Sequence, residues 1–262
     1  MVVRRHTLSN AAWSQISVLF DVPKLTGRKK KHTDREVLNA ILWILKTGAP
    51  WRDLPDHFPP WKSVYTRFWR MSRDDRWSKV LAHLAKEHDA ETYMIDATIV
   101  RAHQHSAGGK GGSTRIALAT AAPSLIQIGR SRGGLTTKIH ALVDALGNPV
   151  KLVLTPGQRH DITQAAELTA GIHDCELLGD KAYNSDELTQ ALEARNVVVG
   201  VPSKSNRKVK RPYDRHNYKS RHLIENFFCR LKGARRMATR YDKTARSYFA
   251  MVTIAAVLVW LA

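Results

Sequence analysis

Three acidic side chains stand at positions where a carboxylate needs a specific partner. Asp96 interrupts TYMIDATIV, an apolar run whose alternation predicts a strand. Asp180 follows the strand pattern CELLG and precedes a helix, and Glu225 lies in the helical pattern YKSRHLIENFFCRLK. A carboxylate in an apolar strand is costly unless it is paired or binds a metal ion. Each aspartate alone is more readily explained as structural, but the three together indicate a shared site.

The chemistry that these carboxylates suit is metal-dependent attack on a phosphodiester. Three oxygen ligands favour Mg²⁺ or Mn²⁺ over zinc. A divalent pair held in this way can activate water or a 3′-hydroxyl and stabilise in-line displacement. The stretch GGKGGS does not make a nucleotide-binding loop, because Lys110 is followed by glycine where such a loop has serine or threonine. We therefore expect a metal cofactor and no nucleotide cofactor.

The helix that carries Glu225 places its polar groups in one line. At 100° per residue, four polar side chains fall within roughly 60° of one another: Tyr218, Arg221, Glu225 and Lys232. The apolar side chains fall on another side, which we expect to pack against a sheet: Leu223, Ile224, Phe227 and Leu231. An ion pair between Arg221 and Glu225, four residues apart, explains two members of this polar line but not the other two.

The charge of the chain favours an anionic polymer as partner. The formal net charge is +19, and the segment from Lys204 to Arg240 holds thirteen lysines and arginines against two acids. A field of this sign makes a small cationic ligand unsuitable. Nucleic acid is the first candidate, an anionic membrane surface the second and ribosome-like structural binding the third. We expect phosphate contacts from Arg235 and Arg236 in this segment, and from Lys181 directly after Asp180.

Residues 1–88 have the pattern of a small helical domain. Ser9 and Thr33 or Asp34 are N-cap candidates, and Gly48 is a candidate helix stop. In WKSVYTRFWRMSR the apolar and aromatic residues share one helix face, and cations and hydroxyls share the other. That outer face suits a helix-turn-helix DNA reader, although a plain helical bundle with a polar surface fits equally well. In the first interpretation DNA is contacted by Lys62, Arg67 and Arg70.

From residue 89 the pattern changes to strands mixed with helices. The predicted order is a strand, a hairpin around Gly147-Asn148, then helix, strand, helix, strand and two helices. We therefore expect an α/β fold with a mixed sheet over residues 89–262. The glycine- and serine-rich stretch 106–134 is expected to be a loop or insertion. His160 and Asp161, after the hairpin, are weaker candidates to approach the site.

The sequence also indicates the compartment. The start of the chain lacks the apolar core of a signal peptide, and the apolar run MVTIAAVLVWLA is too short to span a bilayer. The two cysteines, Cys175 and Cys229, lie outside any C-x-x-C motif and are expected to be buried, reduced thiols. We expect a cytoplasmic protein with no membrane partner.

The motifs resemble one known family. The spacing Y-(2)-R-(3)-E-(6)-K in the polar line resembles the signature of insertion-sequence DDE transposases. The stretches DATIVRAH, GRSRGGLTTKIHALVDALGNPV, LLGDKAY and TRYDKT resemble blocks of the insertion-sequence-five family, within the four/five superfamily. TDREVLNAILWILKTGAPWRDLP resembles the helical N-terminal domain of that family. The resemblance covers nearly the whole chain, but the segment 113–128 departs from it, because a shorter polar loop is expected there.

The resemblance implies a ribonuclease H-like catalytic core with a metal-binding catalytic triad: Asp96, Asp180 and Glu225. The metal would be Mg²⁺, with Mn²⁺ able to substitute, and DNA near the cut would be positioned by Tyr218, Arg221 and Lys232. The protein would be a bacterial, nucleoid-associated DNA transposase. It would bind the terminal inverted repeats of double-stranded DNA, cut the ends and join them to target DNA, as a homodimer or larger assembly on DNA. Two alternatives stay open: an inactive or repurposed transposase that only binds DNA, and a junction nuclease that cuts without joining.

Overall fold

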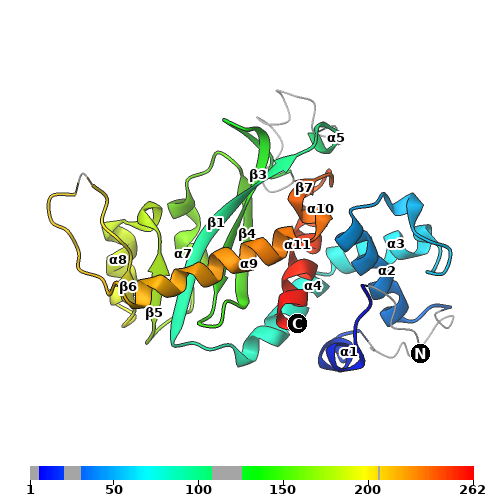
Figure 1. The fold of residues 1–262 in the computed structure, drawn as a ribbon, viewed down its shortest axis with the longest axis horizontal. Helices are drawn as coiled ribbons and strands as arrows, with labels where there is room; N and C mark the ends of the chain where they lie inside the picture. Colours follow the sequence, from blue (N-terminus) through cyan, green and yellow to red (C-terminus); the bar gives the residue numbers. More distant parts are fainter. Residues whose placement is uncertain (1–5, 21–30, 108–125, 206) are drawn as a thin grey trace.

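The computed structural model describes residues 6–20, 31–107, 126–205 and 207–262 (Figure 1). Most of the expected loop or insertion 106–134 lies outside the described residues, as do residues 113–125 of the divergent segment. Part of the basic connector GRKKKHTD lies outside them as well.

Short helices build the first part of the described chain. They are α1 (Asn10–Ser17), α2 (Asp34–Thr47), the 3-10 turn η1 (Trp51–Asp53), α3 (Trp61–Arg73), α4 (Arg76–Leu84) and the 3-10 turn η2 (Ala85–Glu87). The expected caps are confirmed. The Ser9 hydroxyl accepts from the Ala12 amide, and Thr33 and Glu36 form a reciprocal capping box at the start of α2. Gly48 ends α2 with φ +73°, a conformation that glycine adopts without strain.

A mixed sheet follows, as the alternation of strand and helix patterns predicted. Its described strands are β1 (Thr92–Ala102), β2 (Gly129–Ser131), β3 (Gly134–Val143), β4 (Pro149–Pro156), β5 (Glu176–Gly179), β6 (Val198–Gly200) and β7 (Thr239–Arg240). β1 lies in the middle, antiparallel to β3 and parallel to β5, and β3 pairs with β4 in the expected hairpin. The central strand is therefore the one that carries Asp96.

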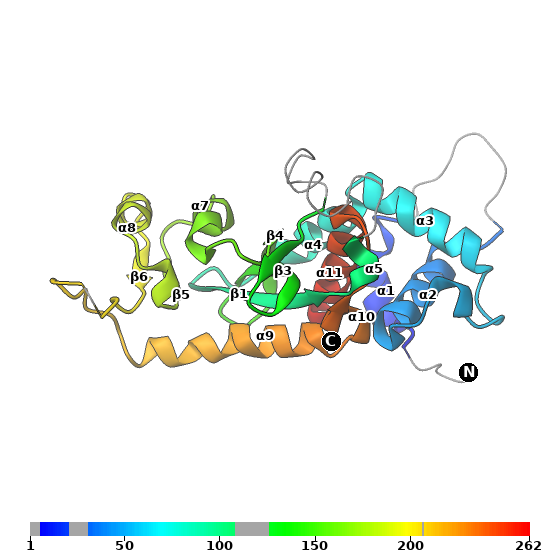
Figure 2. The ribbon, with the colours of Figure 1, turned by 90° about the horizontal axis from the view of Figure 1, so that it is seen from above.

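Helices cover both faces of the sheet. The described helices and 3-10 turns of this part of the chain are α5 (Gln104–Ala107), η3 (Asp161–Gln164), α7 (Ala165–Leu168), η4 (Lys181–Tyr183), α8 (Asp186–Glu193), η5 (Asn217–Arg221), α9 (His222–Lys232), α10 (Arg235–Ala238) and α11 (Ala245–Trp260). Figure 2 shows α9 running along one face, with α7 and α8 on the opposite side. The two faces of β1 thus meet different neighbours.

The segment YKSRHLIENFFCRLK, which continues as GARR to residue 236, has a helical pattern that predicts one long helix, and this prediction is wrong. The polar line begins in the 3-10 turn η5, continues through α9 and stops at Lys232. Gly233 is a poor helix former, and Ala234 after it has extended backbone (ψ 116°), so α10 starts in a new direction. Cys175 is buried as expected, but Cys229 is exposed, because it falls one turn after Glu225 on the polar side of α9.

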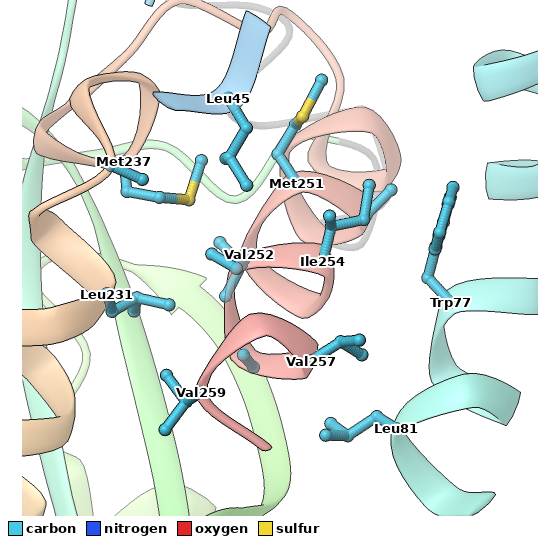
Figure 3. Packing of buried hydrophobic residues seen from close by; sticks show 14 of the residues in the cluster. Leu45, Trp77, Leu81, Leu231, Met237, Met251, Val252, Ile254, Val257 and Val259 are labelled. Carbon is cyan, nitrogen blue, oxygen red and sulfur yellow. The ribbon is translucent and has the colours of Figure 1, made fainter. Parts of the chain in front are cut away.

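The core is built around α11, whose residues are buried along almost its whole length. Figure 3 shows its side chains contacting residues from α2, α4, α9 and α10. The same buried cluster includes Met94 and Val100 of β1, so one apolar core connects the helical region with the α9 face of the sheet. A second cluster fills the opposite face, under α7 and α8. Among the described residues, none of the helices combines the length and apolarity needed to cross a bilayer.

The central position of α11 generates a stability prediction. Ile254 is 1% exposed, so Ile254→Ala leaves a cavity between α11 and its neighbours. We expect the free energy of unfolding to fall by about 2–5 kcal/mol, measured by urea denaturation. Val198→Ala, at a side chain exposed on β6, is the matched control and is expected to change stability little. An equal loss in both variants would contradict the central role of α11.

Candidate active site

Parallel pairing brings Asp96 and Asp180 together. The register pairs Met94 with Leu178 and Ile95 with Gly179, so the next positions are Asp96, within β1, and Asp180, directly after the end of β5. Because parallel strands run in the same direction, paired residues point to the same face. The carboxyl ends of parallel strands are where sites of α/β proteins form. The Asp180 carboxylate also accepts from the Ala182 amide at 2.8 Å, which holds it at the start of η4.

Helix α9 brings Glu225 to the same face. Its apolar residues Ile224, Phe227 and Leu231 belong to the buried cluster that includes Met94 of β1. This packing fixes the rotation of the helix about its axis, so the polar line faces the edge of that contact. The Glu225 side chain remains 57% exposed.

Arg221 joins the strand and helix carboxylates. One guanidinium nitrogen, Nη2, donates to Asp96 Oδ2 at 2.6 Å, and Nη1 donates to Glu225 Oε1 at 2.8 Å. The contact with Glu225 is the expected ion pair at four-residue spacing. The contact with Asp96 spans 125 positions of sequence and is visible only in the fold. The third nitrogen, Nε, is buried and has no partner among the described residues.

Burial raises the pKa of Asp96 above its ordinary value. The Ala97 amide and the Arg221 guanidinium oppose this rise, whereas Asp180 and Asp161 add to it. Burial also raises the pKa of Tyr218, which the nearby Arg221 opposes and Asp180 supports. The site therefore gathers negative charge in a partly dehydrated position, where a cation is strongly favoured.

Lys232 completes the polar line by contacting β1. Its ammonium donates to the Thr98 hydroxyl at 2.6 Å and to the Ile99 carbonyl at 3.2 Å. Thr98 lies two residues beyond Asp96 and therefore on the same face of the strand. Arg221 and Lys232 thus attach the two halves of the polar line to β1 on either side of Glu225.

The donor set suits a divalent cation by type, since all three candidate ligands are carboxylates. Their arrangement holds a guanidinium between Asp96 and Glu225. Within the part of the chain that the structure describes, no three Asp, Glu, His or Cys side chains are gathered closely enough to hold a metal ion. Arg221 links Asp96 with Glu225, and Asp180 is near enough for its charge to raise the pKa of Asp96.

The other predicted DNA contacts divide into two groups. Four cations are exposed: Lys62, Arg70, Lys181 and Arg235. The Arg67 side chain instead donates to the His32 carbonyl at 2.8 Å and forms an ion pair with Asp34, which ties α3 to the start of α2. Arg236 is buried and pairs with Asp242 at 2.9 Å. On α3, Tyr65 and Trp69 are exposed although they share the aromatic face, because Val64, Phe68 and Met71 fill the core contact.

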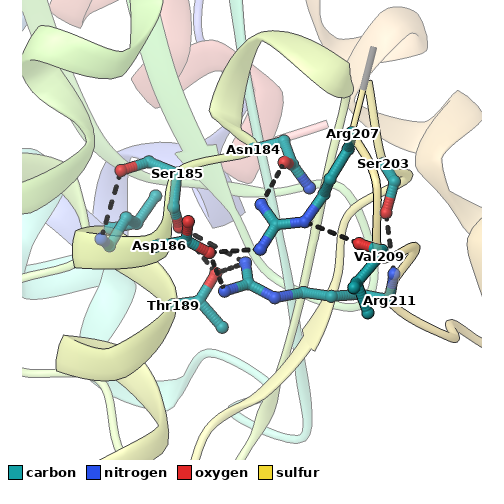
Figure 4. A network of polar contacts seen from close by, with 9 residues as sticks. Asn184, Ser185, Asp186, Thr189, Ser203, Arg207, Val209 and Arg211 are labelled. Atoms are coloured by element: carbon teal, nitrogen blue, oxygen red, sulfur yellow. Dashed lines mark hydrogen bonds and ion pairs between the residues drawn. The ribbon is translucent and has the colours of Figure 1, made fainter. Parts of the chain in front are cut away.

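The basic segment is also partly engaged by its own fold. Arg207 and Arg211 both pair with Asp186 at the start of α8, and Arg207 also donates to Asn184 (Figure 4). These contacts hold the loop after β6 against α8. The cations that remain exposed in the segment are Lys204, Lys208, Lys210, Arg215, Lys219, Arg230 and Arg235.

A polar cluster on the opposite face of the sheet was largely missed by sequence reasoning. Asp161, a weaker candidate, lies on this opposite face and accepts from Lys138 at 2.7 Å, and its charge raises the pKa of Asp96 through the sheet. His140 is fully buried, bonds the Thr155 hydroxyl at 2.7 Å and lies 4.0 Å from Asp161. His140 pairs across the sheet with Ala97, the neighbour of Asp96. The signal was a histidine and a lysine alternating within an apolar strand, KIHALV.

The burial of His140 generates a pH prediction. Burial lowers its pKa to about 4, which Lys138 supports and Asp161 opposes. Below about pH 6.5, His140 therefore becomes protonated in the unfolded chain but stays neutral in the folded chain. Stability is full above that pH and falls as the pH drops towards 4, by about 3 kcal/mol for this group.

Urea denaturation between pH 7 and 4 checks this prediction. The variant His140→Gln is expected to lose that part of the pH dependence, and His216→Gln, at an exposed histidine, is expected to keep it. Parallel curves for the wild type and His140→Gln would show that His140 does not remain neutral in the fold.

The fold and the family models agree on a class of protein, the ribonuclease H-like DDE transposases. Residues 87–260 match the family model for the transposase DDE domain, and residues 8–81 match that for a putative transposase of the IS4/5 family. The chain belongs to the IS4/5 family of insertion-sequence transposases. It is an enzyme of DNA transposition, and enzymes with this domain generally use a divalent metal.

Individual relatives agree with this assignment. The chain is 38% identical over 130 residues to a putative transposase for insertion sequence element IS6501 from Brucella ovis, covering 48% of this chain and 99% of the relative. It is 43% identical over 88 residues to an uncharacterised protein of Sinorhizobium fredii, covering 32% of this chain and 70% of that protein. The piggyBac transposase, solved in a synaptic complex with hairpin DNA, shares the fold at TM-score 0.50 and 11% identity. The match covers 95% of this chain and 70% of the piggyBac chain.

Proposed function

We propose that Asp96, Asp180 and Glu225 are the catalytic carboxylates and that they hold Mg²⁺, which Mn²⁺ can replace. The observation that carries this proposal is the double contact of Arg221 with Asp96 and Glu225. A cation already lies between a strand carboxylate and a helix carboxylate that are 129 positions apart in sequence. Asp180 supplies the third carboxylate beside Asp96, through the pairing of β1 with β5.

The bound metal would activate water or a 3′-hydroxyl and stabilise charge on the phosphodiester. The protein's own residues would position the DNA. Arg221 keeps one buried donor, Nε, without a partner among the described residues, and a phosphate oxygen is a suitable acceptor for it. Tyr218, like any tyrosine, is protonated at neutral pH, and burial raises its pKa further, so its hydroxyl can donate to phosphate as well. Lys232 adds a positive charge on the same line.

We infer that the substrate is the terminal inverted repeats of a bacterial insertion sequence, and then target DNA. The helical domain, residues 1–88, would bind double-stranded DNA through Lys62 and Arg70, and the domain of residues 89–262 would cut and join it. Lys181 and Arg235 are exposed cations in the catalytic domain and suit phosphate contacts. Arg67 and Arg236 would support the DNA-contacting surfaces through their internal ion pairs.

Two transposon ends must be held together for joining, so the working assembly would be a homodimer or larger on DNA, in the bacterial cytoplasm at the nucleoid. The name of the piggyBac structure describes such a synaptic complex for that protein. The alternative of a protein that only binds DNA has no support in the site, because all three carboxylates are present.

Nicking of an inverted-repeat duplex in Mn²⁺ tests the assignment of the carboxylates. We expect Glu225→Gln to lower the rate by at least about a hundredfold, because the loss of a metal ligand removes several kcal/mol of transition-state stabilisation. DNA binding, measured by anisotropy, is expected to remain. Glu193→Gln, at an exposed acid on α8, is the control. Nicking by Glu225→Gln at the wild-type rate would refute the assignment.

Metal binding can be measured without catalysis. Mn²⁺ is expected to raise the melting temperature of the wild type, because a ligand that binds only the folded state stabilises it by mass action. Asp96→Asn is expected to remove most of this metal-dependent shift, whatever its own melting temperature. A shift of wild-type size in Asp96→Asn would place the metal elsewhere.

A further inference from the structure

A cleft lies between the helical region and the segment TRYDKT, residues 239–244. None of the residues proposed for catalysis lines this cleft. It is lined from one side by η1 and α3 and from the other by residues after β7, and its volume is about 430 Å³. A hollow of this size is typical of sites for small organic groups. We call it the aromatic cleft, because four of its lining residues are Trp51, Trp61, Tyr65 and Tyr241.

The rings of the aromatic cleft are accessible. Tyr241 is 46% exposed and Tyr65 is 39% exposed, and the Trp51 ring packs edge-on against Tyr65 with centroids 5.3 Å apart. Large exposed aromatic side chains are costly to keep in water and are common where nucleobases stack. Two tyrosines and two tryptophans around one hollow offer flat apolar surfaces to an unpaired base.

Cations accompany the rings. The Arg52 guanidinium lies 5.7 Å from the centre of the Trp61 ring, and Lys243 also lines the aromatic cleft. The buried pair of Arg236 and Asp242 forms part of the wall. In that pair the donor Nε of Arg236 and the acceptor Oδ2 of Asp242 are both buried and have no partner among the described residues. Nucleobase edges carry both acceptors and donors, and the cations suit the phosphates.

The aromatic cleft adjoins a second hollow at the end of β1. Tyr241 lines a second hollow together with Arg101 and His103, and the His103 ring stacks on Tyr241 with centroids 4.7 Å apart. Arg101 lies on β1 five residues beyond Asp96, a rise of about 17 Å along the strand. The second hollow therefore extends the aromatic cleft along the end of β1 and adds two cationic or aromatic side chains, Arg101 and His103.

We propose that the aromatic cleft binds an unpaired strand of DNA, by stacking its bases on Trp61 and Tyr241. In a duplex the base faces are stacked on one another, so rings that line a cleft find stacking partners only in an unpaired strand. The proposal rests on the proposed function in one respect, since the cut that frees a strand end, and so lets its bases separate, is made at the carboxylates.

Anisotropy with labelled single-stranded oligo-dT of about 12 nucleotides tests the proposal, in a range typical of such sites. EDTA is present throughout, so no DNA is cut. Trp61→Ala and Tyr241→Ala are each expected to weaken binding about fivefold or more, because each stacked base contributes at least that factor. Trp61→Phe and Tyr241→Phe are expected to bind nearly as the wild type, since they keep a ring. This rescue also separates a loss of stacking from a loss of folding.

The matched control is Trp69→Ala. Trp69 lies on the same helix, is 43% exposed and has a cation, Arg73, 4.8 Å from its ring, but it does not line the aromatic cleft. It is expected to bind oligo-dT as the wild type does, and all variants are expected to bind a duplex of the same length equally. Unchanged oligo-dT binding in Trp61→Ala and Tyr241→Ala would overturn the proposal. An equal loss in Trp69→Ala, or an equal loss of duplex binding, would also overturn it.

This experiment is independent of the carboxylates. If oligo-dT binding depends on Trp61 and Tyr241 while Glu225→Gln nicks normally, the aromatic cleft stands and the catalytic assignment fails. If binding does not depend on them while Glu225→Gln loses nicking, the reverse holds.

Discussion

The contact of Arg221 with two carboxylates is the interaction on which the geometry of the site depends. Asp96 lies partly buried inside the sheet and Glu225 lies exposed on a helix packed over it, and the Arg221 guanidinium neutralises charge on both. The helix can lie there because its opposite side is apolar and joins the core around α11. The sheet can lie there because β1 is central and paired on both sides. Apolar packing thus determines the positions of Asp96, Arg221 and Glu225, and the ion pairs among them determine how each side chain is oriented.

The rest of the polar line follows the same logic. Lys232 reaches back to Thr98, one alternation beyond Asp96, so α9 is tied to β1 by polar contacts at two points and by apolar packing between them. A helix held in this way cannot rotate without breaking both sets of contacts. The exposed face of Glu225 is therefore presented at a defined place, as expected of a residue that acts on a bound polymer.

Patterns that depend on local periodicity could be predicted from sequence. The strand around Asp96, the hairpin at Gly147-Asn148, the cap at Thr33 and the stop at Gly48 all follow from alternation, turn chemistry or capping, and all are confirmed. The convergence of Asp96 and Glu225 could be predicted only as a hypothesis, because their separation in sequence gives no distance. The division at residue 88 stays a prediction.

What sequence could not predict depends on partners chosen by the tertiary fold. A helical pattern shows which side of a helix a cation occupies. It does not show that Arg67 forms an ion pair with Asp34, or that Arg236 is buried beside Asp242. The break after Lys232 depends on where α10 packs, and the cluster of Lys138, His140 and Asp161 depends on the register of β3.

The single core that joins the helical region to the sheet has a geometric consequence. Residues of α2, α3 and α4 share one buried cluster with α9, α11 and β1. The helical region and the sheet are therefore packed against each other and not joined only by a flexible linker. If the helical region binds a DNA sequence and the carboxylates cut the DNA, the protein fixes the distance between the bound sequence and the cut. One extra base pair between them would displace the scissile bond by about 3.4 Å and turn it by roughly 35° around the helix axis. The rigidity of the core would thereby determine at which nucleotide a mobile element ends.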